Sequence, residues 1–177
     1  MIGRKLVFSS PVAALTLSLA ACGGSSTEAP TYCPTPFTVT DAERLTHFKD
    51  GPGRDPRDIA YEAVVSGSRT SCEALKTQIN VTLVMRISVS AGPSVVAGPT
   101  RVPYFVRVID GSGRIVQGQE FTADFRLSTA NPRGSSQEEL SLTLPRDGAY
   151  RIAIGLKPTA EELNYNRQGV NKAPTQR

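Results

Sequence analysis

Three cysteines and one histidine are the side chains of this 177-residue sequence that could support thiol or metal chemistry. The cysteines are Cys22, Cys33 and Cys72, and the histidine is His47. A single histidine excludes a multi-histidine metal site, and the sequence lacks the set of His and Cys ligands that zinc or iron requires. Three cysteines cannot all pair within one molecule, so one of them is free, paired with another molecule or modified.

His47 could act as the base of a Ser/His/Asp arrangement. The sequence has no recognisable nucleophile motif, which favours a surface or hydrogen-bonded histidine. A group of nearby carboxylates could bind calcium or form an acid/base pair, but their spacing fits no calcium loop. They are Asp41, Glu43, Asp50, Asp55 and Asp58. Because Lys and Arg alternate with them, we expect a salt-bridged, solvated loop, with no catalytic residue, metal site or cofactor.

Residues 1–21 have the three parts of an export signal. Arg4 and Lys5 form a positive region, residues 12–19 are apolar, and Ala20 and Ala21 are small. The apolar stretch is too short to span a membrane as a helix, and Gly and Ser follow it directly. We therefore expect this segment to be removed after export.

The sequence Leu-Ala-Ala-Cys at residues 19–22 resembles the lipobox of bacterial lipoproteins. The resemblance implies that Cys22 is acylated, that the mature chain begins there, and that the chain is held at a membrane by its lipid. Several acyl chains exceed the single-chain threshold for stable anchoring. In the sorting rule of enteric bacteria, Asp after the cysteine retains a lipoprotein at the inner membrane. Gly23 stands at this position, which implies the outer membrane and leaves the inner membrane as the alternative.

The formal net charge of +4 changes when the signal is removed. Loss of Arg4 and Lys5 leaves 18 basic side chains against 16 acidic ones, and the two signs are interspersed. The sequence has neither a basic patch for phosphate contacts nor an array of aromatic side chains for base stacking. Nucleic acid is therefore excluded as a partner.

With Cys22 acylated, Cys33 and Cys72 remain as an even pair in an exported domain. The periplasm is oxidising, so we expect a disulfide between them, closing a loop of about 40 residues. A redox site is the alternative. A Cys-x-x-Cys spacing is missing, and no His or Lys lies next to either cysteine to lower the thiol pKa.

Alternation of apolar and polar residues with a period of two dominates the mature chain. The clearest case is the apolar series at residues 79, 81, 83, 85, 87 and 89. Similar runs near residues 59–65, 102–108, 115–116, 121–127, 140–144 and 150–156 predict about seven strands. We therefore predict an all-β fold, a single antiparallel β-sandwich of residues 32–167, with a small closed barrel as the alternative. The late strands resemble those of immunoglobulin-like and fibronectin-like domains.

The ends of the domain have their own patterns. Residues 22–31 are rich in Gly, Ser, Thr and Pro and predict a flexible tether, and residues 168–177 predict a disordered tail. Thr159 with Glu162 forms a capping box, which predicts a short helix from Ala160 to Tyr165 or Arg167.

Pro103 lies within the predicted strand at residues 102–108 and indicates that this strand begins there or lies on an edge of its sheet.

The loop at residues 48–58 is the best candidate for a recognition surface, because two Gly and two Pro fix its path and charges alternate along it. Its candidate interaction residues are Lys49, Asp50, Gly51, Gly53, Arg54 and Asp55. A second candidate is the C-terminal segment at residues 163–167. The alternatives are that the loop is a long ordered crossover and that the segment is a docked helix.

Three stretches resemble a group of alphaproteobacterial lipoproteins that has no assigned activity. They are residues 44–48 with 51–55, residues 102–106 and residues 163–167. The resemblance supports the architecture and implies no mechanism. We therefore predict a non-catalytic structural or protein-interaction module of the cell envelope, facing the periplasm. An envelope ligand- or glycan-binding protein is the alternative, and an envelope hydrolase is the third class.

Overall fold

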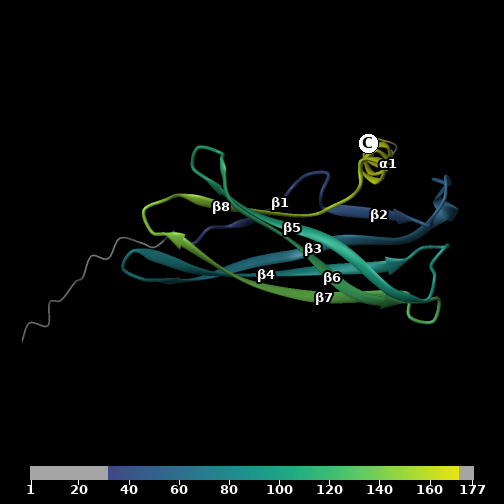
Figure 1. Ribbon diagram of the computed structural model, residues 1–177, viewed down its shortest axis with the longest axis horizontal. Helices are drawn as coiled ribbons and strands as arrows, with labels where there is room; N and C mark the ends of the chain where they lie inside the picture. The colour runs from purple at the N-terminus through teal and green to yellow at the C-terminus, as the bar shows by residue number, and fades with distance from the viewer. Residues whose placement is uncertain (1–31, 172–177) are drawn as a thin grey trace, which may run out of the picture.

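The computed structural model describes residues 32–171. The predicted signal at residues 1–21, Cys22 and the tether at residues 22–31 lie outside the described residues, as do residues 172–177. Within the described part, eight strands form two sheets, and one short helix follows them (Figure 1). The prediction of an all-β sandwich is confirmed. No helix between residues 32 and 171 is long and apolar enough to cross a membrane.

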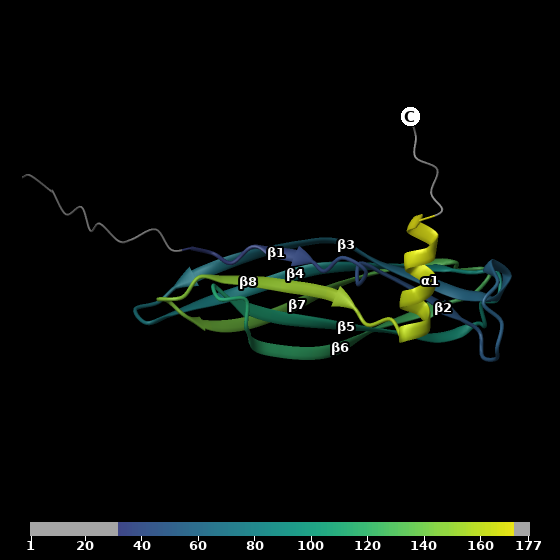
Figure 2. The same cartoon turned by 90° about the horizontal axis from the view of Figure 1, so that it is seen from above.

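Each sheet has four strands. The first has the order β1 (Pro36–Thr38), β8 (Tyr150–Leu156), β5 (Gly98–Asp110) and β6 (Ile115–Leu127). The second has the order β2 (Arg44–Phe48), β3 (Ile59–Ala74), β4 (Gln78–Ala91) and β7 (Arg133–Pro145). The sheets lie face to face along the long axis of the molecule (Figure 2).

The core lies between the sheets and follows the alternation in the sequence. The alternating apolar residues of β4, from Ile79 to Val89, are all buried. They form one hydrophobic cluster with Val102, Tyr104, Val106 and Val108 of β5 and with apolar residues of β8. Burial of these side chains on both inner faces is the main force that holds the sheets together.

Two strands and one pairing differ from the prediction. The short strands β1 and β2 have no long alternation and were not predicted, and β1 pairs with β8 in parallel, whereas the other pairs are antiparallel. The runs near residues 115–116 and 121–127 belong to one strand, β6. The start of β6 is exposed on both faces, so burial imposes no alternation there.

The prediction that Pro103 begins a strand or lies on an edge strand is wrong. β5 begins at Gly98 and lies between β8 and β6. Its pairing with β8 covers residues 104–110 and stops before Pro103, whose carbonyl accepts a hydrogen bond from the N–H of Lys157 beyond the end of β8. The proline nitrogen faces this same side, where no strand partner requires a donor, so no hydrogen bond of the sheet is lost.

The C-terminal helix, α1 (Ala160–Asn171), begins at the predicted residue and runs beyond Arg167. It packs on β2, the edge strand of the second sheet, and crosses the sandwich at the end opposite to the start of the described chain (Figures 1 and 2). A helix of this length is marginal in isolation, so its contacts with β2 and the flanking loops must maintain it.

Candidate binding site at the end of the sandwich

The predicted interaction loop leaves the end of β2 and is ordered by its own side chains. Asp55 caps a 3₁₀ turn, η1 (Pro56–Asp58), and accepts a hydrogen bond from the N–H of Arg57, while the side chain of Asp58 accepts one from the N–H of Asp55. Gly51 has a φ of 114°, a conformation that favours glycine. A Cβ atom at Gly53 would lie 2.4 Å from the Asp58 carboxylate. The two glycines therefore set the path of the loop.

His47 and Glu162 connect β2 with α1. The Nδ1 atom of His47 lies 2.8 Å from Oε1 of Glu162. The other carboxylate oxygen accepts a hydrogen bond from the N–H of Thr159, and the hydroxyl of Thr159 accepts one from the N–H of Glu162. This is the predicted capping box, and it also holds the histidine. Burial disfavours the charged carboxylate, but the hydrogen bonds from His47 and Thr159 together outweigh it and hold the pKa of Glu162 below its ordinary value.

Arg54 joins the predicted loop to the second predicted segment. Its guanidinium lies 2.5 Å from the Glu161 carboxylate and donates to the carbonyls of Gly51 and Gly53. It also lies over the ring of Phe48, at 5.2 Å from the centroid, and Phe48 meets Tyr165 edge to face. The two candidates that the sequence treats separately therefore form one surface.

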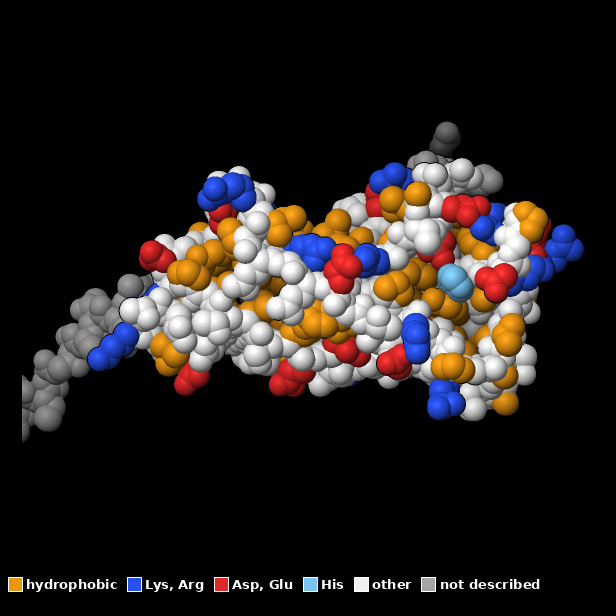
Figure 3. Space-filling view, in the orientation of Figure 1, with side chains coloured by type: hydrophobic (Ala, Val, Ile, Leu, Met, Phe, Trp, Pro, Cys, Tyr) orange, Lys and Arg blue, Asp and Glu red, His pale blue; other side chains and the backbone are white. Residues whose placement is uncertain are grey.

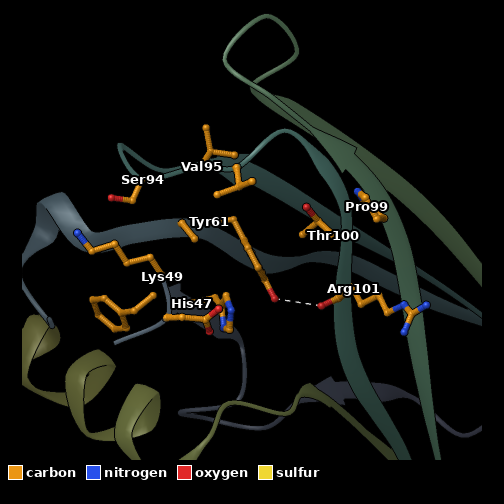
Figure 4. Close-up of a pocket in the computed structure, with 12 residues that line it drawn as sticks. His47, Lys49, Tyr61, Ser94, Val95, Pro99, Thr100 and Arg101 are labelled. Carbon is orange, nitrogen blue, oxygen red and sulfur yellow. Dashed lines mark hydrogen bonds between the residues drawn. The ribbon is translucent and has the colours of Figure 1, made fainter. Parts of the chain in front are cut away.

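A cleft of about 550 Å³ opens beside this surface. His47 and Lys49 line one side, and the loop between β4 and β5 lines another with Val95 and Val96. Pro99, Thr100 and Arg101 at the start of β5 complete the wall (Figure 4). The cleft thus combines apolar and polar groups from both sheets, and Figure 3 shows the histidine at the surface of this end.

Tyr61 forms the floor of the cleft. Its ring stacks on His47 with centroids 4.7 Å apart, and its hydroxyl donates to the carbonyl of Arg101 at 3.0 Å (Figure 4). Burial, followed by the negative charge of Glu162, raises the pKa of Tyr61 to about 12. The contact between Tyr61 and Arg101 joins the two sheets and fixes the position of the cleft.

Two of the polar side chains that line the cleft are engaged in structural contacts. Lys49 forms an ion pair with Asp58 at 2.7 Å, and the hydroxyl of Ser94 donates to the carbonyl of Arg57 at 2.7 Å. No three His, Cys, Asp or Glu side chains of the described region form a group that could hold a metal ion. This arrangement is suited to binding, because its side chains are held in place by one another.

The six predicted interaction residues have different environments. Arg54 and Gly53 are partly buried against the helix and the turn, and Lys49 and Asp55 are exposed but held in ion pairs with Asp58 and Arg57. Asp50 and Gly51 are exposed at the tip. The sequence did not predict the contribution of Val95, Val96 and residues 99–101 to the cleft. The one signal for it was the Gly-Pro-Ser run at residues 92–94, directly after β4, which marks a turn.

Cys33 and Cys72 lie at the opposite end of the molecule and have the geometry of a disulfide. Their sulfur atoms are 2.07 Å apart and their Cα atoms are 5.7 Å apart. The bridge joins the segment before β1 to the last residues of β3. The hydroxyl of Thr70 donates to the carbonyl of Pro34 beside it at 2.7 Å.

Comparison of the chain with models of protein families, with curated proteins and with solved structures finds no match. The function must therefore be inferred from the residues and geometry of the chain itself.

Proposed function

We propose that this protein is a lipoprotein of the bacterial outer membrane, anchored through Cys22, whose sandwich faces the periplasm and binds a partner protein of the envelope without catalysis. The cleft beside His47 and Tyr61, together with the loop tip at Asp50 and Gly51, is the proposed binding surface. The lipobox-like sequence at residues 19–22 supports the anchor, and the mixed lining of the cleft supports recognition.

The observation that most supports this proposal is the distance between the two ends of β3. Tyr61, at the floor of the cleft, and Cys72, bonded to Cys33 near the start of the described chain, lie on the same strand. Eleven residue-to-residue steps of extended strand separate them, which corresponds to about 36 Å. The cleft therefore lies far from the start of the described chain, which supports the proposal of a module that reaches a partner (Figure 1).

In vivo photocrosslinking tests the binding surface. A photoreactive amino acid at Val96, which is 81% exposed on the rim of the cleft, is expected to give one recurrent adduct with an envelope protein. The same group at Glu139, exposed on β7, is the matched control and is expected to give none. Adducts of equal yield and pattern at both positions would show that the cleft has no specific protein partner.

Two further measurements test the anchor and the alternative ligand. Wild-type protein is expected to incorporate radiolabelled palmitate and to remain with the membrane fraction, and the Cys22→Ala variant is expected to lose both properties. Retention of the purified domain by immobilised envelope saccharides, lost on change of cleft residues, would favour a glycan-binding function. The buried ring of Tyr61 favours the protein partner, because it presents little aromatic face to a sugar.

A further inference from the structure

Most of the exposed large apolar side chains of the described residues lie at one end of the sandwich. The exposed ones among the described residues are Tyr32, Val96, Ile115 and Val116, together with Leu75, which is 37% exposed. Val96 lies on the rim of the cleft. The other four lie at the opposite end, where the described chain begins, and are named here the tether-end surface.

The sheet registers place these four residues at the same end of the sandwich, Leu75 on the second sheet and Ile115 and Val116 on the first. Leu75 follows the last residue of β3, three positions after Cys72, and Tyr32 precedes Cys33, to which Cys72 is bonded. The parallel pairing of β1 with β8 begins at Pro36, three positions after Cys33, opposite Ile152. β8 begins at Tyr150, opposite Asp110 at the end of β5. Ile115 begins β6 directly after the turn that follows Asp110.

The turn that presents Ile115 and Val116 is firmly held. The carboxylate of Asp110 accepts hydrogen bonds from the N–H and hydroxyl of Ser112 and from the N–H and guanidinium of Arg114. Ile115 is 62% exposed and Val116 is 47% exposed, and neighbouring residues of a strand point to opposite faces. Both side chains are therefore exposed, one on each face of the strand, directly after an ordered turn.

The part of the chain outside the described residues indicates what covers this end. Ten peptide steps join Tyr32 to Cys22, so a lipid on Cys22 lies at most about 36 Å from the tether-end surface. A short tether gives the bilayer a high effective concentration at this end of the molecule. Tyr is enriched at the membrane interface, and Lys76 and Arg114 beside the apolar groups can extend their charges to the headgroups.

We infer that the tether-end surface rests on the interface of the bilayer that holds the acyl chains of Cys22. This inference rests on the proposed lipid anchor and specifies how the anchored domain is oriented. Tyr32, Leu75, Ile115 and Val116 enter the headgroup region, the long axis of the sandwich stands away from the bilayer, and the cleft beside His47 faces the periplasm.

Tryptophan fluorescence tests the inference, because the chain has no tryptophan of its own. The full lipoprotein carrying Ile115→Trp is incorporated into vesicles of phosphatidylethanolamine and phosphatidylglycerol, with or without bromine on the acyl chains near the headgroups. We expect a blue-shifted emission that brominated lipid quenches about twofold. The Val96→Trp variant, at the other end, is the matched control and is expected to show neither effect. Equal emission and no quenching for both variants would overturn the inference.

Failure of the anchor is distinguished from failure of the docking. Mass spectrometry of the same preparations reports acylation of Cys22, and flotation reports attachment. An acylated, floating Ile115→Trp variant without quenching overturns the docking and leaves the anchor in place. An unacylated chain overturns both. A blue shift that grows with protein concentration and is insensitive to bromine identifies a second protein molecule on this surface and also overturns the docking.

Discussion

The carboxylate of Glu162 lies 2.8 Å from Nδ1 of His47, although 115 positions separate the two residues in the sequence. One oxygen caps the first turn of α1 and the other fixes the histidine. Because a carboxylate is an acceptor, Nδ1 carries the hydrogen, and in the neutral ring Nε2 is an acceptor. The helix cap thereby determines which groups His47 presents to the cleft.

Glu162→Ala is expected to lower the free energy of unfolding by about 1–2 kcal/mol, because it removes a helix cap and the partner of His47. Urea unfolding followed by circular dichroism measures this loss. The neighbouring Glu161→Ala is the control, since it breaks an exposed ion pair with Arg54 and is expected to change stability by less than about 1 kcal/mol. Equal losses in the two variants would contradict the role given to Glu162.

The lowered pKa of Glu162 predicts an acid-dependent loss of stability. A carboxyl group whose pKa is depressed in the folded state contributes stability at pH values above its unfolded pKa of about 4.3. This contribution is lost as the pH falls through the folded pKa. The stability difference between wild type and Glu162→Gln is therefore expected to shrink as the pH falls below the unfolded pKa of the carboxyl group. Urea unfolding at a series of pH values measures it, and a difference that grows on acidification would contradict the prediction.

The contact between His47 and Glu162 also shows where prediction from the sequence ends. Thr159 and Glu162 lie three positions apart, so local spacing predicts the capping box. The partner of His47 depends on where α1 packs, and no local pattern encodes that. The same reason applies to the cleft, because Tyr61 and Arg101 come from different sheets and meet only after the sandwich closes.

Regular alternation predicts a strand only where burial imposes it. β4 is buried along one face from end to end, and its apolar series identifies it without ambiguity. β1 has three residues, too few to show a period, and was found only through its pairing with β8. The loop charges were correctly expected to form salt bridges, but the attachment of Arg54 to α1 required the fold.

Replacement of both Cys33 and Cys72 by Ala is expected to destabilise the domain by about 2–5 kcal/mol. Without the bridge, the unfolded chain regains the conformational entropy of a loop of about 40 residues. The free energy of unfolding in urea, with and without reductant, measures this effect. Reductant is expected to destabilise the wild type and to leave the double variant unchanged. Two alkylatable thiols in native protein from the periplasm would instead support reactive cysteines at these positions.

Gly155 and Phe105 form a cross-strand pair in which the ring requires the glycine. A Cβ atom at Gly155 would lie 2.7 Å from the ring of Phe105 and 2.7 Å from the Cβ of Ala42, so both neighbours would have to move. Overpacking of this kind is expected to make Gly155→Ala less stable than wild type by about 1–3 kcal/mol.

Gly67 is the matched control for this substitution, because it also lies within a strand, β3, and a Cβ atom there would meet no atom within 4 Å. Alanine removes backbone entropy from the unfolded chain, so Gly67→Ala is expected to be neutral or to stabilise the domain by up to about 1 kcal/mol. Thermal unfolding of the two variants side by side separates steric crowding from the general effect of alanine in a strand. If both variants lost equal stability, the contact with Phe105 would not be the cause, and the outer face of the first sheet would be more plastic than its geometry indicates.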